Sequence, residues 1–215
     1  MSSSENATIA FTGKEPVTKF IQNILVATDV FISRAQLETI ASAFEPRAFR
    51  KKELFVKQGK VNDESFFMTH GFMRAYTHGI DGQEITTYFY GSNRPVFEAA
   101  SLFTKTPSLE NIQALTDCEG FSLPFEKLNK LFHNVPEFRE YGRAMLAKEF
   151  LLYKKRTLSM INQTAEERYE ELISTEKEIF KYAQLKQIAS YLGVTDTSLS
   201  RIRREFHARQ LRLVG

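Results

Sequence analysis

The stretch Leu185–Arg204, LKQIASYLGVTDTSLSRIRR, has the pattern of two short helices joined by a tight turn. Its apolar and small residues fall three or four positions apart on both sides of one glycine: Ile188, Ala189, Leu192, Val194, Leu199 and Ile202. Gly193 can adopt the left-handed backbone conformation that ends one helix and turns the chain into the next. The pattern predicts a helix-turn-helix, and the alternative is a helical hairpin with another purpose.

The second helix of this pair presents short polar and basic side chains, which suit the major groove of double-stranded DNA. The candidate DNA-binding residues are Thr195, Asp196, Thr197, Ser198, Ser200, Arg201, Arg203 and Arg204. We expect Thr197, Ser198 and Arg201 to face base edges, because hydroxyls contact either base type and arginine bridges O6 and N7 of guanine. Arg203 and Arg204 suit phosphates, which position a protein on DNA without reading its sequence.

Some residues of this segment keep two interpretations. Thr195 is the expected N-cap of the second helix, a role that is compatible with a phosphate contact. Asp196 either favours the helix dipole or accepts a hydrogen bond from N4 of cytosine. Arg209 and Arg212 extend a basic run towards the end of the chain, either as phosphate contacts or as a solvated tail.

The composition of the chain excludes several classes. The 215 residues carry a net charge of only +3, so nucleic-acid binding is argued from local charge and not from the total. The single cysteine, Cys118, cannot form an intramolecular disulfide, an iron–sulfur cluster or a cysteine-based zinc site. We expect no cofactor, no metal site and no catalytic residue.

The N-terminal segment is polar and carries no secretory signal, and no stretch is apolar enough to span a bilayer. We therefore expect a flexible tail, no membrane partner and a cytoplasmic location. Residues 17–46 then show helical spacing, with apolar positions at Phe20, Ile21, Ile24 and Leu25 and at Leu37, Ile40, Ala41 and Phe44. Ser33 can cap the second of these helices, which ends before Pro46.

Residues 47–123 change to short runs of aromatic and β-branched residues that are separated by glycines. The expected strands are Glu53–Gln58, Ser65–Thr69, Met73–Thr77 and Glu84–Tyr90. The turn Ile80–Gln83 contains an Asp-Gly pair, which favours a hairpin because both residues accept a positive φ. The spacing predicts an antiparallel barrel or jelly roll.

After a short helix opened by Pro124, a long helix is expected from Pro136 to about Ile161. It carries two apolar stripes. One contains Phe138, Tyr141, Met145 and Leu152, and the other contains Ala144, Ala147, Leu151, Leu158 and Ile161. An ordinary surface helix needs one apolar face, so the second stripe predicts an interface with the same helix of another subunit. The alternative is a helix that is buried inside one chain.

These segments define an α+β chain with four parts. We expect a flexible tail at 1–16, a β-roll domain at 17–135, a dimerisation helix at 136–162 and a helix-turn-helix domain at 163–215. Thr164 and Glu167 form a capping-box pattern at the start of the last part.

The order of roll, long helix and helix-turn-helix resembles the catabolite activator and fumarate–nitrate regulator (CRP/FNR) family of bacterial transcription factors. The similar stretches are Leu54–Gly59, His70–Tyr76, Gln113–Glu119 with Phe125–Leu128, Thr164–Leu172 and Leu185–Arg204. The resemblance implies a winged-helix-like DNA-binding domain, a homodimer on a near-palindromic DNA site, and RNA polymerase as a further partner. It also implies a small-molecule effector of unknown identity in a cyclic-nucleotide-binding-like roll.

The chain departs from the phosphate-binding cassette of members that bind cyclic nucleotides. Glu98 matches the glutamate of the cassette, Phe97 replaces its glycine, and Ser108 stands near the position of its arginine. The candidate effector pocket is therefore Arg74, Glu98 and Ser108, with Arg74 or Arg94 as a replacement charge. A phosphate would lack its charge partner and face Glu110, so a cyclic-nucleotide-responsive regulator is the alternative, not the leading interpretation.

Two further departures concern the ends of the resemblance. Asp196 and Thr197 replace the Arg-Glu pair that is frequent in the family, so a different target sequence is expected. Few residues follow Phe206, too few for a full wing. A cupin-like metal enzyme is a remote alternative, because the strands hold no His-x-His pair and His70 and His78 alone flank one hairpin.

Overall fold

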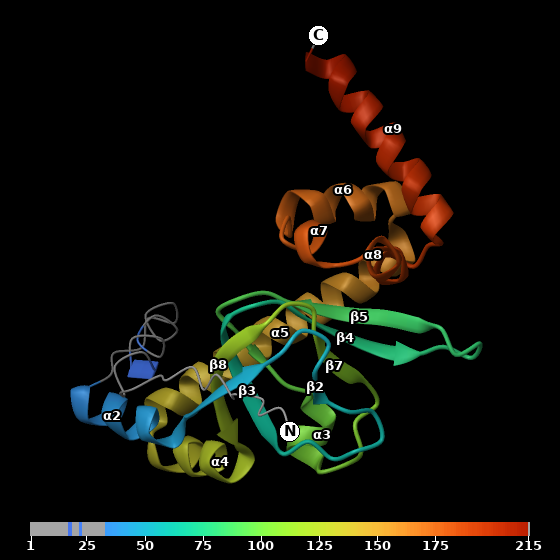
Figure 1. The fold of residues 1–215 in the computed structure, drawn as a ribbon. Coiled ribbons are helices and arrows are strands. Elements are labelled where there is room, and N and C mark those ends of the chain that lie inside the picture. Colours follow the sequence, from blue (N-terminus) through green and yellow to red (C-terminus); the bar gives the residue numbers. More distant parts are fainter. Residues whose placement is uncertain (1–16, 19–21, 23–32, 215) are drawn as a thin grey trace, which may run out of the picture.

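The computed structural model describes residues 17–18, 22 and 33–214, and of residues 212–214 only the backbone. A β-roll, one long helix and a small helical domain follow each other along the chain (Figure 1). The tail predicted for residues 1–16 and the helical positions Phe20, Ile21, Ile24 and Leu25 lie outside the described residues. The predicted fold class, an α+β chain with a roll and a helix-turn-helix, is confirmed.

Within the described part of the chain the roll contains two four-stranded antiparallel sheets. One has the order β1-β8-β3-β6 and the other β2-β7-β4-β5. The strands are β1 (Glu45–Phe49), β2 (Leu54–Val56), β3 (Glu64–His70), β4 (Met73–His78), β5 (Glu84–Tyr90), β6 (Arg94–Val96), β7 (Asn111–Ala114) and β8 (Cys118–Pro124). The strands expected from glycine-separated runs are all present.

Strand alternation divides the apolar residues between two cores. Phe66 and Met68 of β3 point between the sheets and pack with Met73 and Ala75 of β4. Phe67, between them in sequence, belongs to a second core beneath the helices α2 (Arg34–Ala43) and α4 (Phe125–Asn134). Strand β3 therefore contributes both to the interior of the roll and to the core beneath its covering helices.

The hairpin between β4 and β5 forms where the Asp-Gly pair predicted it, but with a different turn. The amide of Gly82 donates to the carbonyl of Gly79, and only Gly82 has a left-handed backbone, with φ of +76°. The turn is thus Gly79–Gly82, a type I turn that is followed by a left-handed glycine. Asp81 keeps a negative φ, because the one extra loop residue removes the need for a second left-handed position.

The remaining helices are α3 (Ala99–Thr104), α5 (Pro136–Asn162), α6 (Ala165–Thr175), α7 (Ile179–Tyr182), α8 (Leu185–Leu192) and α9 (Asp196–Val214). Ser33 caps α2 and a capping box opens α6 at Thr164, as predicted, and the cap at Ser33 is also a capping box, with Gln36. The predicted long helix is α5, and Figure 1 shows it running behind the roll to the helical domain. Among the described residues after Pro124 no strand occurs, and α9 runs on where a wing would follow.

Gly120 of β8 lies so close to the backbone of β3 that no side chain would fit at this position. A Cβ atom there would lie 2.2 Å from the carbonyl oxygen of Phe67 and 3.0 Å from the Cα of Met68. We expect Gly120→Ala to lower the free energy of unfolding by about 3 kcal/mol, because rigid backbone must move. Chemical denaturation monitored by circular dichroism measures this change.

Gly59→Ala is the matched control for this substitution. Gly59 has a φ of +78°, but a Cβ atom there would meet no other atom within 4 Å, so only backbone strain is added, about 1 kcal/mol. If both variants lost the same free energy of unfolding, the backbone around Gly120 would be able to accommodate the added methyl group, contrary to our expectation.

Candidate nucleic-acid interface

The helix-turn-helix is formed as the sequence predicts. Gly193 ends α8 with φ of +70° and allows the turn into Val194, whose amide donates to the carbonyl of Ala189. Ala189 is fully buried where α8 meets α9. Together with Ile188, Leu192, Leu199 and Ile202, it forms the core of the helical domain around the buried ring of Tyr169.

The outer face of α9 is hollowed into a shallow depression. It is lined by Asp196, Thr197, Ser200, Arg201 and Arg204. At 100° per residue these side chains lie on the side of the helix opposite Leu199 and Ile202, which are buried. The depression is therefore the surface that α9 offers to a partner.

Ser198 is not part of this surface, contrary to the expected grouping with Thr197 and Arg201. Its hydroxyl accepts a hydrogen bond from Thr195 Oγ1 at 3.0 Å, and its amide donates to the same Thr195 oxygen at 3.2 Å. Thr195 is thus the N-cap that the sequence predicted. Helical rotation places Ser198 near the buried side, and Ser200 takes its place beside Arg201.

Three arginines of α9 have no acidic partner among the described residues. Arg201, Arg203 and Arg204 are exposed and form no ion pair with any described residue. Arg209, further along, pairs with Glu170 of α6 at 2.7 Å. The cations that remain free are therefore those nearest the depression, whereas Arg209 also stabilises the packing of α9 on α6.

The helical domain packs directly against the roll. Phe72, Phe89 and Leu115 of the roll share one apolar core with α6, α7 and α8. The ring of Phe89 lies 5.1 Å from that of Tyr191, and the amide of Thr86 donates to Ser190 Oγ at 3.1 Å. Changes in the roll can therefore reach α8 through direct contact.

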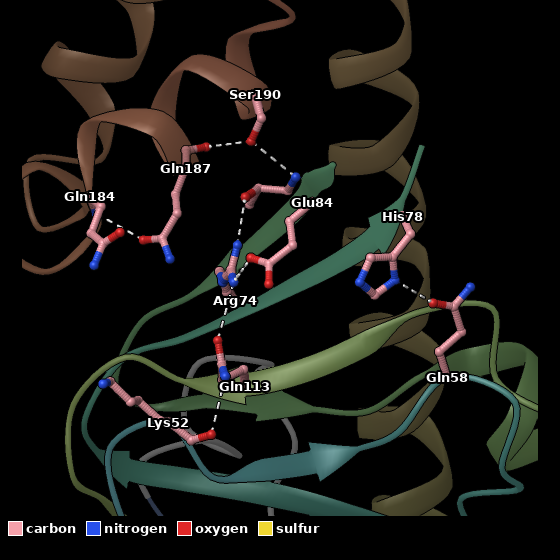
Figure 2. A network of polar contacts seen from close by, with 10 residues as sticks. Lys52, Gln58, Arg74, His78, Glu84, Gln113, Gln184, Gln187 and Ser190 are labelled. Carbon is pink, nitrogen blue, oxygen red and sulfur yellow. Dashed lines mark hydrogen bonds and ion pairs between the residues drawn. The ribbon is translucent and has the colours of Figure 1, made fainter. Parts of the chain in front are cut away.

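Arg74 lies in this junction and not in an effector pocket, which corrects the prediction from sequence. Figure 2 shows its guanidinium between the β-hairpin and α8, paired with Glu84 and donating to Gln113 Oε1 at 3.2 Å. It also stacks 4.1 Å from the centre of the Tyr76 ring. Strand alternation is the cause: Met73 and Ala75 point into the roll, so Arg74 between them points out.

Glu98 and Ser108 do not share a pocket either. Ser108 is buried and its hydroxyl donates to the carbonyl of Glu110, a local turn contact. Glu98 caps α3 by accepting hydrogen bonds from the amides of Ala100 and Ser101. Glu98 lines a cavity between the roll and α5, but neither Arg74 nor Ser108 does. The candidate pocket is thus wrong as a set, and of its three residues Glu98 alone borders the cavity beside α5.

The histidines of the hairpin are not gathered into a metal site. His78 Nδ1 lies 3.1 Å from Gln58 Oε1, and His70 is exposed at the end of β3. Figure 2 shows the His78 ring directed towards the side chain of Gln58. In the part of the chain that the structure describes, no group of three or more His, Cys, Asp or Glu residues could hold a metal ion.

The two stripes of α5 have different surroundings. Phe138 and Tyr141 are buried against α4, and Leu152 lines a cleft beside the helical domain. The other stripe consists of Ala144, Ala147, Leu151, Leu158 and Ile161. Leu151 and Ile161 expose 63% and 76% of their surface, and Leu158 exposes 47%. The alternative of a helix buried inside one chain therefore does not describe this stripe.

The described residues form a β-roll that is joined by a long helix to a helix-turn-helix domain. Residues 46–135 match the family model of the cyclic nucleotide-binding domain. The chain has the fold of CRP/FNR regulators with this domain and a helix-turn-helix, which confirms the resemblance predicted from the sequence at the level of fold. No curated protein sequence is significantly similar to the chain.

Three solved structures illustrate the likeness. The c-di-GMP-responsive global regulator CLP of Xanthomonas campestris superposes with a TM-score of 0.66 at 16% identity, over 83% of this chain and 94% of CLP. FixK2 of Bradyrhizobium japonicum gives 0.65 at 19% identity, over 78% and 86%. The catabolite activator protein of Thermus thermophilus gives 0.52 at 17% identity, over 83% and 85%.

Within the described residues, no helix has both the length and the apolarity that are needed to cross a lipid bilayer.

Proposed function

We propose that this protein is a sequence-specific regulator of transcription that binds double-stranded DNA as a homodimer. The observation that carries the proposal is the exposed, unpaired basic face of α9, with Arg201 and Arg204 beside Thr197 and Ser200. A helix with this face, projecting from a compact helical pair, fits the major groove.

Within this proposal the residues of α9 divide into two groups. Arg201 bridges O6 and N7 of guanine, and the hydroxyls of Thr197 and Ser200 contact base edges next to it. Arg203 and Arg204 bind phosphates and fix the position of α9 in the groove. Asp196, at the rim of the depression, is placed to accept from N4 of cytosine.

The homodimer forms through the exposed stripe of α5. Ala144, Ala147, Leu151, Leu158 and Ile161 are spaced 3, 4, 7 and 3 residues apart, which is the a/d spacing of a coiled coil with Lys154 at the remaining position. Pairing two α5 helices buries the leucines and places two copies of α9 on one side of the dimer. RNA polymerase is a further partner within this proposal.

The roll holds a small-molecule effector in the same proposal. Support comes from the match of residues 46–135 to a domain family that is named for ligand binding, and from the cavity between the roll and α5. Because the roll and α8 share a core, a ligand that displaces α5 or the roll changes the position of α9.

Selection from random DNA duplexes tests the function directly. We expect the purified full-length chain to enrich two inverted half-sites whose centres lie about one helical turn, or a multiple of it, apart. Enrichment of a single asymmetric site would contradict the dimer, and recovery of no sequence above background would contradict sequence-specific binding.

A further inference from the structure

The cavity between the roll and α5 has walls of a distinctive chemistry. It measures about 320 Å³, within the range of small-ligand sites. The residues that line it are Tyr90, Pro95, Phe97, Glu98, Ala99, Glu110, Leu146, Glu149, Phe150 and Tyr153. Four of these are aromatic and three are glutamates, and none of the residues that the structure places on its wall is Lys, Arg or His.

The aromatic wall is held in place by ring contacts. Tyr90 is almost fully buried, and its ring lies 4.8 Å from that of Tyr88. Tyr88 in turn stacks on Tyr153 of α5 at 5.2 Å. Phe150 of α5 also lines the cavity and is 66% exposed. It directly precedes Leu151, a residue of the exposed stripe of α5. The cavity thus combines aromatic faces from the roll with aromatic faces from α5.

Among the described residues, the three carboxylates accept hydrogen bonds from neutral groups only. Glu98 accepts from backbone amides, Glu110 accepts from the hydroxyl of Thr87, and Glu149 accepts from the Tyr88 hydroxyl at 3.1 Å. None of the three forms an ion pair with a described residue. Three acids on one small cavity therefore leave its negative charge unbalanced.

Burial, together with this negative charge, shifts the pKa values of two groups on the wall. Burial raises the pKa of Glu110, and the charge of Glu98 raises it further. Burial, followed by the charges of Glu110, Glu149 and Glu98, raises the pKa of Tyr153 to about 12. Both raised pKa values show that further negative charge is unfavourable at this site. A bound cation would therefore lower both pKa values.

We propose that this cavity binds a small organic cation that carries one or two ammonium groups. The aromatic faces bind the cation through their π systems, and Glu98, Glu110 and Glu149 accept hydrogen bonds from its N–H groups. A cyclic nucleotide is disfavoured, because its phosphate would face three carboxylates without a cationic partner. The binding itself is independent of DNA, whereas its role as the effector signal rests on the proposed function.

A chain of hydrogen bonds leads from this cavity to the helical domain. The Tyr88 hydroxyl that donates to Glu149 also accepts from Arg94 Nη1 at 3.4 Å. Arg94 Nη2 then donates to Glu176, at the C-terminal end of α6, at 3.3 Å. An ammonium group that binds Glu149 competes for the carboxylate that holds Tyr88. The same ligand therefore acts on the contact between Arg94 and the DNA-binding domain.

The test is calorimetric titration of the full-length protein, without DNA, with 1,4-diaminobutane as the probe. We expect saturable binding of the diamine, no binding of the neutral 1,4-butanediol and no competition by cyclic AMP. Glu110→Gln and Glu149→Gln should each weaken diamine binding by about tenfold or more, since each removes one charge-assisted acceptor. Glu126→Gln, a glutamate of α4 outside the cavity, should bind like the parent chain.

Three outcomes would overturn the cavity proposal. They are no saturable diamine binding, equal binding to all the variants, and displacement of the diamine by cyclic AMP. Thermal unfolding of each variant confirms that it is folded, so weaker binding is not mistaken for lost structure. DNA binding by the ligand-free protein is measured separately. A chain that binds DNA but not the diamine refutes only this inference, and one that binds the diamine but not DNA refutes only the proposed function.

Discussion

Replacing Leu151 and Leu158 together by lysine is expected to convert the proposed dimer into monomers and to weaken specific DNA binding about 100- to 10,000-fold. Both leucines are exposed on one face of α5, at 63% and 47% of their surface. In the dimer each would lie near its copy, so the variant would place four cations in an apolar interface. A monomer can bind only one half-site and loses the gain from linking two.

Light scattering of the double variant and gel shifts on the selected operator measure these two effects. The matched control is Ile80→Lys combined with Leu109→Lys, which replaces two exposed apolar residues on loops of the roll. This control should stay dimeric and keep its affinity for the operator. A dimer that persists in the α5 variant would place the subunit interface on another surface.

The second large effect is expected at Arg201. Arg201→Ala should cost about 1–3 kcal/mol for each half-site and relax base preference at one position in each. The guanidinium is exposed in the depression of α9 and has no ion pair with a described residue, so its hydrogen-bonding capacity is free for a base. In a dimer the loss counts twice, because both half-sites lose the same contact.

Two comparisons separate base reading from charge alone. Arg201→Lys keeps the charge but loses the planar pair of donors, so it should lose most of the specificity of the parent chain. Arg203→Ala should weaken binding evenly on all sequences and reduce the slope of log K against log salt by about one. If Arg201→Ala also weakened operator and random DNA equally, Arg201 would be a phosphate contact and not a base reader.

Features set by neighbouring residues could be predicted from the sequence. The helix-turn-helix follows from apolar spacing around Gly193, and the capping boxes follow from Ser33 and Thr164 with their partners three residues later. The hairpin follows from the Asp-Gly pair, although the extra loop residue changed the turn type. Such features depend on hydrogen bonds and backbone conformations within a few residues, so the local sequence specifies them.

The candidate effector residues show where this kind of prediction ends. Arg74 lies one position from core residues in β4, and only the pairing of the sheets decides that its side chain faces α8. Glu149 and Tyr153, which the sequence analysis missed, lie four residues apart on one face of α5. That spacing could have suggested a shared face, but not that the face meets Glu110 across a cavity.

The roll, the long helix with two apolar stripes and the basic helix-turn-helix could each be recognised from local periodicity and capping. Which side chains meet depends instead on how these elements pack together. This packing places Arg74 in the junction between the roll and the helical domain, and it puts Ser200 rather than Ser198 beside Arg201. It also brings Glu98, Glu110 and Glu149 to the wall of one cavity. The physical reason is that local hydrogen bonds specify an element, whereas the packing of one element on another, over long sequence separations, specifies what its faces contact.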